Sequence, residues 1–230
     1  MHRRPRFPEG GYVFHVLNRA VGRGIIFEKS GDYAAFEKIL RQAWDRFGMR
    51  LLCYTLMPNH WHLVLWPERD GTLSPYMQWL TVTHVRRWHA HRHTEGTGPV
   101  YQGRFKAFPT EEGNHFLTVC RYVERNALRA RLVRRAENWR WSSLWHRVYE
   151  TAVPWLSPWP VSIPDGWTEH VNSVQTEAEL AALRRSVVRG APFGSPDWQQ
   201  QTATELGLQA TLCPRGRPRL GQGDSTEKET

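Results

Sequence analysis

The chain has 230 residues, of which 40% are hydrophobic and 23% are charged, proportions typical of a globular protein. This length suffices for one full core with an appendage. No apolar run is long enough to span a membrane, and the first residues lack the apolar core of a secretory signal, so we expect a cytoplasmic protein. The three cysteines are isolated in the sequence, which argues against a disulfide framework or a zinc knuckle.

The charge balance indicates a phosphate-rich partner. The net charge is +9, and of the 31 basic side chains only four are lysines. Arginine suits bidentate contacts to phosphate, and nucleic acid is the commonest partner of such an excess. Codon bias in a GC-rich genome accounts for the arginine-to-lysine ratio equally well, but not for the excess of positive charge.

Strand-like and helix-like segments follow one another through the first half of the chain. Residues 11–18 have the composition of a strand, and residues 30–47 have helical spacing and end before a glycine. Residues 50–57 and 60–66 are predicted strands joined by a tight turn at Pro58-Asn59, which predicts a hairpin.

A helix over residues 73–93, a strand over residues 100–109 and a third helix over residues 111–128 come next. The order β-α-β-β-α-β, followed by one extra helix, predicts an α+β protein with a ferredoxin-like (RRM-like) antiparallel sheet and helices on one face. The first and third strands are central neighbours in that fold. Residues 60–66 should therefore lie in the middle of the sheet.

Two histidines in the third predicted strand, His60 and His62, share one face because strand side chains alternate. Trp61, Leu63 and Leu65 take the other face, which we expect to be the core, leaving the histidines on an open face. Such a pair can hold one metal ion from a rigid platform. Structural histidines and a hydrolytic zinc site are the alternatives, although no third spaced ligand completes a zinc set.

The helix over residues 111–128 has two distinct sides. At ~100° per residue, an apolar stripe and a polar group are separated by roughly 120°. Tyr122 and Asn126 belong to the polar group, so Tyr122 is predicted to lie outside the core, although ordinary amphipathic packing of this tyrosine is the alternative. His115 is on the same side and is a candidate general base. The stripe consists of Phe116, Cys120, Val123 and Ala127.

Arginines surround this helix. Eight occur between residues 121 and 147, against only two glutamates, which favours a phosphate-binding surface over an ordinary solvated face. They are Arg121, Arg125, Arg129, Arg131, Arg134, Arg135, Arg140 and Arg147.

Three segments, residues 56–64 (LMPNHWHLV), 101–106 (YQGRFK) and 121–126 (RYVERN), resemble the HUH-type single-tyrosine transposases, and within them the REP-associated tyrosine transposases. The resemblance covers roughly residues 10 to 145. It implies that His60 and His62 bind a divalent cation, Mg²⁺ or Mn²⁺, with Asn126 where relatives often carry glutamine as a third ligand. It also implies that Tyr122 attacks single-stranded DNA, giving a 5′-phosphotyrosine intermediate and a free 3′-hydroxyl.

On this basis residues 1–148 are predicted to be the catalytic domain, and residues 149–175 a connector rich in proline and tryptophan. Residues 176–220 are predicted to be a helical and basic DNA-binding extension, and residues 221–230 a disordered tail. The extension forms either a helix-turn-helix-like pair or a helical hairpin packed on the catalytic domain. Residues 214–219 (PRGRPR) resemble an AT-hook.

The expected DNA-binding side chains lie in both parts of the chain. They are Arg104, Lys106, Arg121, Arg125, Arg129, Arg184, Arg185, Arg215, Arg217 and Arg219.

The sequence as a whole predicts a metal-dependent DNA endonuclease and strand transferase. We expect it to act on single-stranded or hairpin DNA of the repetitive extragenic palindrome type, at the nucleoid of a bacterium and as a monomer or homodimer. The alternative is an RRM-like module that stacks unpaired bases on aromatic side chains without chemistry. The histidine pair argues against it, because stacking needs aromatic faces rather than paired imidazoles.

Overall fold

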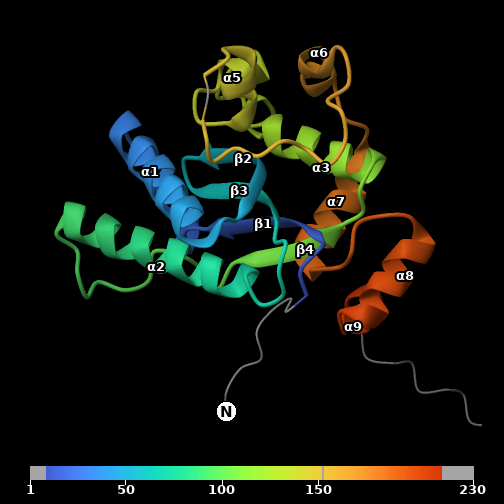
Figure 1. The fold of residues 1–230 in the computed structure, drawn as a ribbon. Helices are drawn as coiled ribbons and strands as arrows, with labels where there is room; N and C mark the ends of the chain where they lie inside the picture. The colour runs from blue at the N-terminus through green and yellow to red at the C-terminus, as the bar shows by residue number, and fades with distance from the viewer. Residues whose placement is uncertain (1–8, 152, 214–230) are drawn as a thin grey trace, which may run out of the picture.

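The computed structural model describes residues 9–151 and 153–213 of the chain. Its centre is a four-stranded antiparallel sheet in the order β2-β3-β1-β4 (Figure 1). The α+β fold is the predicted one, and the first and third strands are central neighbours as expected. The strands are β1 (Val13–Arg19), β2 (Arg50–Met57), β3 (His60–Trp66) and β4 (Lys106–Thr110).

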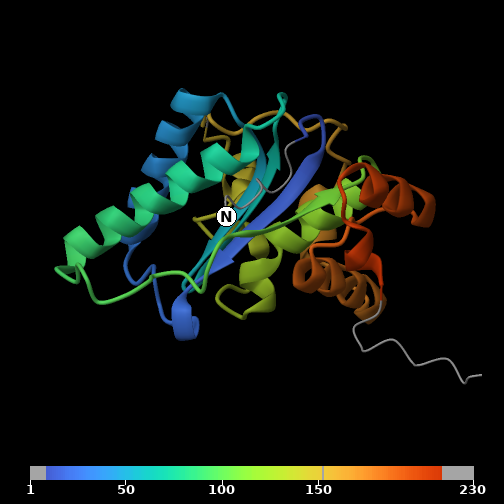
Figure 2. The ribbon, with the colours of Figure 1, turned by 90° about the horizontal axis from the view of Figure 1, so that it is seen from below.

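Two long helices, α1 (Ser30–Phe47) and α2 (Leu73–Arg92), cover one face of the sheet (Figures 1 and 2). Their apolar sides meet the side chains of Trp61, Leu63 and Leu65, all of which are fully buried. The alternation of β3 therefore places its apolar set in this core, as the sequence predicts, and directs the histidines to the opposite face.

That opposite face is covered too, and the expectation of an open face is wrong. The predicted helix 111–128 is divided into α3 (Asn114–Glu124) and α4 (Asn126–Arg129), which pack against β2 and form a second core. Gly113, with φ of +72°, supplies the turn before α3. The stripe of Phe116, Cys120, Val123 and Ala127 is fully buried, as predicted.

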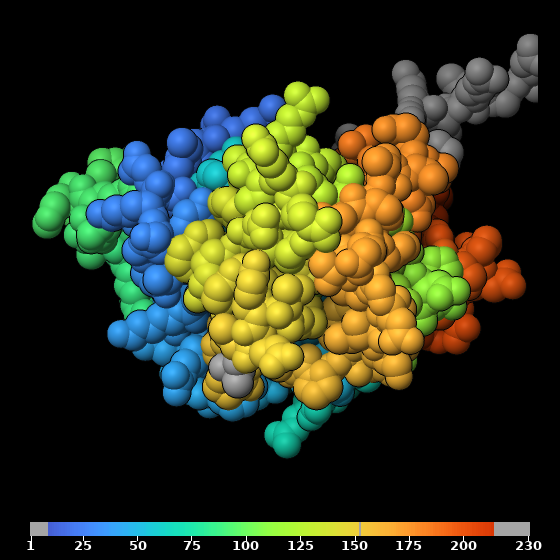
Figure 3. All heavy atoms as spheres, turned by 90° about the horizontal axis from the view of Figure 1, so that it is seen from above, coloured from blue at the N-terminus to red at the C-terminus, as the bar shows by residue number. Residues whose placement is uncertain are grey.

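Several shorter elements complete the described chain. The helices α7 (Glu177–Arg189) and α8 (Pro196–Glu205) lie in the extension predicted to be helical, whereas α5 (Ser143–Val148) and α6 (Trp167–Asn172) have no counterpart in the sequence prediction. In Figure 3 the segments after α4, coloured yellow and orange, form a continuous layer over this side of the molecule. The elements are η1 (Val21–Arg23), η2 (Ala136–Asn138), α5 (Ser143–Val148), α6 (Trp167–Asn172), α7 (Glu177–Arg189), α8 (Pro196–Glu205) and α9 (Gln209–Leu212).

The segment rich in proline and tryptophan is held against the edge strand β2. The Trp159 Nε1 donates to the Leu52 carbonyl at 2.7 Å, and the Ser157 nitrogen donates to the Leu51 carbonyl at 2.7 Å. Trp155 is buried in the core that α1 and α2 form with the sheet. This irregular segment is therefore part of the folded body.

The C-terminal helices pack on the opposite edge of the sheet, beside β4 (Figure 2). The Phe193 nitrogen donates to the Pro109 carbonyl and the Glu111 nitrogen to the Phe193 carbonyl, each at 2.9 Å. The Glu111 carboxylate also accepts from the Ser195 nitrogen at 2.6 Å. Of the two arrangements considered for the extension, these contacts favour helices packed on the catalytic domain. The AT-hook-like segment and the tail lie outside the described residues.

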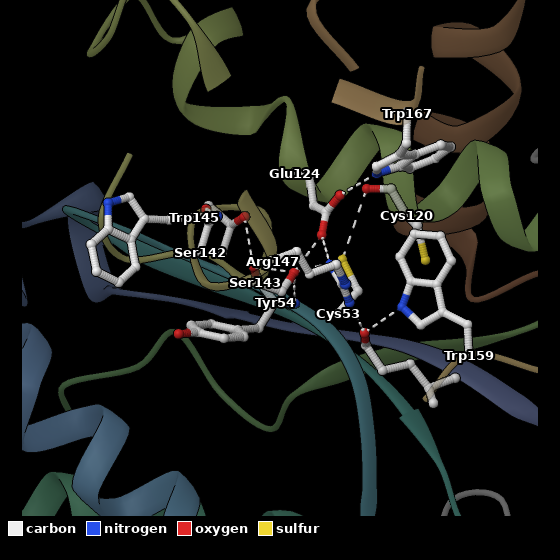
Figure 4. A network of polar contacts seen from close by, with 12 residues as sticks. Cys53, Tyr54, Cys120, Glu124, Ser142, Ser143, Trp145, Arg147, Trp159 and Trp167 are labelled. Carbon is white, nitrogen blue, oxygen red and sulfur yellow. Dashed lines mark hydrogen bonds and ion pairs between the residues drawn. The ribbon is translucent and has the colours of Figure 1, made fainter. Parts of the chain in front are cut away.

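A buried carboxylate joins α3 to the segments that follow it (Figure 4). Glu124 is fully buried and accepts hydrogen bonds from the Ser143 Oγ at 2.6 Å, the Trp167 Nε1 at 2.8 Å and the Arg147 guanidinium. A single charge on α3 thus satisfies donors from α5 and α6. Arg147, expected on a phosphate-binding surface, is instead a structural partner of this carboxylate.

Replacing Glu124 with glutamine should lower the free energy of unfolding by about 3 kcal/mol, because a half-buried guanidinium loses its counter-charge and the new amide donor faces other donors. Urea unfolding followed by circular dichroism measures this change. The matched control is Glu112→Gln, since Glu112 is exposed. Equal stability of the two variants would contradict a structural role for the Glu124 network.

Candidate active site

Cross-strand pairing assembles a polar cluster on the face of the sheet that α3 covers. His60 pairs with Arg19 of β1, and His62 pairs with Leu17, which in turn pairs with Lys106 of β4. Directly opposed residues of antiparallel strands share a face. His60 is therefore bordered by Arg19, and Lys106 lies on the same face two strands away from His62.

Each histidine uses its Nδ1 in a hydrogen bond. The Nδ1 of His60 lies 2.6 Å from the Asn59 Oδ1, and because an amide oxygen only accepts, this Nδ1 carries the proton. The Nδ1 of His62 lies 2.9 Å from the Nε2 of His15. Among the described residues, no hydrogen bond uses the Nε2 of either His60 or His62, so both atoms remain available.

Both imidazoles are neutral at pH 7. Burial lowers the pKa of His60 to about 3, with further contributions from the guanidiniums of Arg19 and Arg129. Burial also holds the pKa of His62 well below its ordinary value, and the neighbouring His60 and His15 lower it further. Neutral imidazole is the form that binds a metal ion.

Tyr122 lies directly beside the pair. Its ring meets the His62 ring edge to face, with centroids 5.8 Å apart, and the His15 ring with centroids 6.1 Å apart. Its exposed fraction is only 6%. The prediction that Tyr122 lies outside the core is therefore corrected, because it is buried among the histidines.

Asn126 and Arg129 complete this cluster from α4. The Arg129 Nη2 donates to the Asn126 Oδ1 at 3.0 Å, and the guanidinium carbon lies 4.2 Å from the centroid of the Tyr122 ring. The Asn126 Nδ2 and the Arg129 Nη1 are both buried, and neither has a hydrogen-bond partner among the described residues. The cluster thus contains two buried polar atoms without a partner in the described part of the chain.

Two arginines predicted to bind DNA are turned inward. Arg121 is 5% exposed and donates to the Ser173 and Val174 carbonyls at 3.0 and 3.1 Å. The Arg125 Nη1 donates to the Val171 and Asn172 carbonyls at 2.9 and 2.5 Å. These guanidiniums satisfy the carbonyls at the end of α6, so the structure corrects their assignment to a DNA-binding surface.

Other predicted basic residues are exposed. Arg104 and Lys106 flank the start of β4, and Arg184 and Arg185 lie on α7. Arg185 also lines a cavity of about 380 Å³ between α3 and the C-terminal helices.

His115 lines this cavity as well. Its Nδ1 lies 3.0 Å from the Glu111 carboxylate, and it is two turns from Tyr122, roughly 10 Å along a helix axis. The suggestion that it serves as the general base is therefore corrected.

Sequence reasoning missed three residues of the site, His15, Arg19 and Asn59. Residues 13, 15, 17 and 19 of β1 alternate with Phe14 and Val16, which belong to the core under α1 and α2. Strand periodicity could therefore have placed His15 and Arg19 on the same face of the sheet as His60 and His62. The sequence predicts a turn at Asn59 but does not reveal its hydrogen bond to His60.

The donor set fits one divalent cation. The Nε2 atoms of His60 and His62 are available, whereas the Asn126 Oδ1, the amide atom able to bind a cation, accepts a hydrogen bond from Arg129. Nitrogen donors with an amide oxygen suit ions such as Mn²⁺. Among the described residues, no group of three or more histidine, cysteine, aspartate or glutamate side chains is placed to hold a metal ion.

The chain matches the family model of IS200-like transposases over residues 11–126, just over half of its length. It belongs to this family and is thus a transposase, an enzyme that cleaves and rejoins DNA, which confirms the predicted family. No curated protein shows significant sequence similarity to it. No helix in the described ranges is long and apolar enough to cross a membrane.

The solved structures that are similar to the chain include the following two. One is a REP-associated tyrosine transposase bound to a REP hairpin, with 14% identity and a TM-score of 0.53, covering 73% of this chain and 96% of that one. The other is a protein from Deinococcus radiodurans R1 assigned as a transposase, with 15% identity and a TM-score of 0.38, covering 57% and 92%. The first similarity is one of fold.

Proposed function

We propose that the protein is a metal-dependent, single-strand-specific DNA endonuclease and strand transferase of the REP-associated kind, with Tyr122 as its nucleophile. One observation carries this proposal. The Tyr122 ring stands edge to face on His62, 5.8 Å between centroids, beside two imidazoles with free Nε2 atoms. A phenol held next to a metal-binding pair is suited to phosphoryl transfer.

In the cleavage step, the Tyr122 oxygen forms a bond to phosphorus as the bond to the 3′ oxygen breaks. The products are a 5′-phosphotyrosine and a free 3′-hydroxyl, and the proton lost by the phenol balances the one gained by the leaving oxygen. Joining reverses the step with another 3′-hydroxyl. When bound by His60, His62 and Asn126, Mg²⁺ or Mn²⁺ would polarise the scissile phosphate.

Arg129 contributes charge at the same place. Its guanidinium lies on the Tyr122 ring, and its Nη1 has no partner among the described residues. We assign to Arg129 the stabilisation of the negative charge that develops on the phosphate oxygens. The hydrogen bond to Asn126 holds the guanidinium in place until DNA binds.

For the substrate we propose hairpin-forming repeat DNA, because a transposase of similar fold is bound to a REP hairpin. The exposed side chains of Arg104, Lys106, Arg184 and Arg185 are placed to contact phosphates outside the site. The residues from 176 onward would then serve recognition while residues 1–148 cleave. We expect this reaction at the bacterial nucleoid.

The direct test is covalent trapping. The full chain is incubated with Mn²⁺ and labelled single-stranded hairpin DNA taken from the sequences that flank its own gene. We expect an SDS-stable adduct that contains the 5′ end of the downstream fragment. A protein that binds this DNA tightly but forms no adduct would be a non-catalytic binding module, and the proposal would be wrong.

Deleting residues 214–230 should weaken hairpin binding and flatten its salt dependence, because the deletion removes Arg215, Arg217 and Arg219. Three lost phosphate contacts would reduce the slope of log K against log salt concentration by about 2 to 3. Fluorescence anisotropy at several salt concentrations measures this slope. Ending the chain after Cys213 retains the bonds from Arg189 to the Ala210 and Thr211 carbonyls. An unchanged affinity and slope would mean that recognition lies within the rest of the chain.

A further inference from the structure

His15 is a buried histidine that contacts the site without a part in the chemistry proposed above. It lies in the central strand β1 and is 0% exposed. Its ring lies beside that of His62 in nearly the same orientation, with centroids 5.0 Å apart and 13° between the planes. The His15 Nε2 lies 2.9 Å from the His62 Nδ1, so one hydrogen bond joins the two imidazoles.

A hydrogen bond between two neutral imidazoles holds one proton, which leaves two arrangements. If His62 donates from Nδ1, its Nε2 keeps a lone pair and can bind a cation. If His15 donates from Nε2, the proton of His62 is on its own Nε2, and that atom cannot bind a cation. The direction of this one hydrogen bond therefore decides whether His62 can serve as a ligand.

A cation on the His62 Nε2 leaves the proton of His62 on Nδ1, so the acceptor of this hydrogen bond is then the Nε2 of His15. The His15 side chain forms no other hydrogen bond in the described part of the chain. Its Nδ1 is buried without a hydrogen-bond partner among the described residues. The rings of Phe108 and Tyr122 meet His15 edge to face, with centroids 4.9 and 6.1 Å away. These contacts hold the His15 ring in place against His62.

His15 is fully buried and forms no ion pair among the described residues, so its imidazole is neutral and carries a single proton. With this proton on Nδ1, the Nε2 of His15 can only accept. We propose that His15 is a positioning residue that holds His62 in its Nδ1–H tautomer and keeps the Nε2 of His62 free for the divalent cation. This inference rests on the proposed metal-dependent function.

Two substitutions separate the hydrogen bond from the packing. In His15→Gln, the side-chain oxygen can accept from the His62 Nδ1 and preserve the tautomer. In His15→Phe, a ring of similar size remains but the acceptor is lost. His15→Met is a second apolar replacement, for use if the phenylalanine variant does not fold. The matched control is His84→Gln, since His84 is also buried but bonds to Tyr101 on the other face of the sheet.

The first measurement needs no metal. Two-bond ¹H–¹⁵N correlation spectra of the full chain with ¹⁵N-labelled histidine report which ring nitrogen carries the proton, and loss of one signal in His62→Asn assigns His62. We expect the Nδ1–H tautomer of His62 in the wild type, His15→Gln and His84→Gln. In His15→Phe or His15→Met we expect a shift to the Nε2–H tautomer, which free histidine prefers.

The second measurement is Mn²⁺ binding by titration calorimetry in the absence of DNA. Loss of the orienting partner should weaken Mn²⁺ binding by about 10- to 100-fold in His15→Phe. His15→Gln and His84→Gln should bind nearly as the wild type does. An Nδ1–H tautomer of His62 or an undiminished Mn²⁺ affinity in His15→Phe would overturn the proposal. If the wild type binds no Mn²⁺, the metal-dependent function fails, while the spectra still decide whether His15 sets the tautomer.

Discussion

Replacing Tyr122 with phenylalanine should abolish the covalent protein–DNA adduct and leave DNA binding almost unchanged. The substitution removes one oxygen, and among the described residues no hydrogen bond uses that hydroxyl. The ring contacts with His62 and the Arg129 guanidinium would remain. Since the nucleophile itself is lost, cleavage should fall by at least about a thousandfold. Quantitative SDS gels of labelled hairpin DNA measure the adduct, and anisotropy measures binding.

Tyr149→Phe is the matched control, because the Tyr149 side chain is 50% exposed on the surface. This variant should form adduct at the wild-type rate. A persistent adduct in Tyr122→Phe would show that another side chain attacks the phosphate. A joint loss of adduct and binding would instead mean that the hydroxyl positions the DNA.

Replacing His60 or His62 with alanine should remove DNA cleavage, and a chelator should do the same to the wild type. Each substitution deletes one of the two free Nε2 atoms that we assign to the cation. Mn²⁺ should support cleavage at least as well as Mg²⁺, because imidazole favours the softer ion. Calorimetry without DNA should show weaker Mn²⁺ binding in both variants.

His91→Ala is the control for this pair, since His91 is exposed on α2. It should cleave DNA and bind Mn²⁺ as the wild type does. Full cleavage in EDTA would remove the basis for a metal site at His60 and His62. Binding of Mn²⁺ that survives both alanine substitutions would place the cation elsewhere.

Strand and helix periodicity predicted the sheet and the position of His60 and His62 in its central strand β3. Alternation along residues 60–66 separates Trp61 from His60 and His62, and the buried core around Trp61 confirms that separation. Helical spacing likewise placed Tyr122 and Asn126 on one side of a helix, and both lie beside the histidines or Arg129. Local patterns were sufficient for these residues because the face that a side chain occupies depends only on the strand or helix that carries it.

Periodicity could not show what covers each face. Arg121 and Arg125 occupy polar positions of their helix, yet they bind carbonyls about fifty residues further along the chain. A cationic side chain facing water and one facing a later segment look the same in sequence. His15 was missed for a related reason. The role of His15 depends on its hydrogen bond to His62 of the neighbouring strand β3, which the sequence of β1 alone does not reveal.

The bonds from α3 to the segment around α6 bear on how such proteins can diverge. Arg121, Glu124 and Arg125 all bind partners between residues 167 and 174. Recombination that replaced the segment around α6 would leave the guanidiniums of Arg121 and Arg125 without their carbonyl acceptors and would remove the Trp167 donor of Glu124. We therefore expect such an exchange to destabilise the protein. New DNA preferences are more easily acquired by point changes at exposed positions such as Arg184 and Arg185.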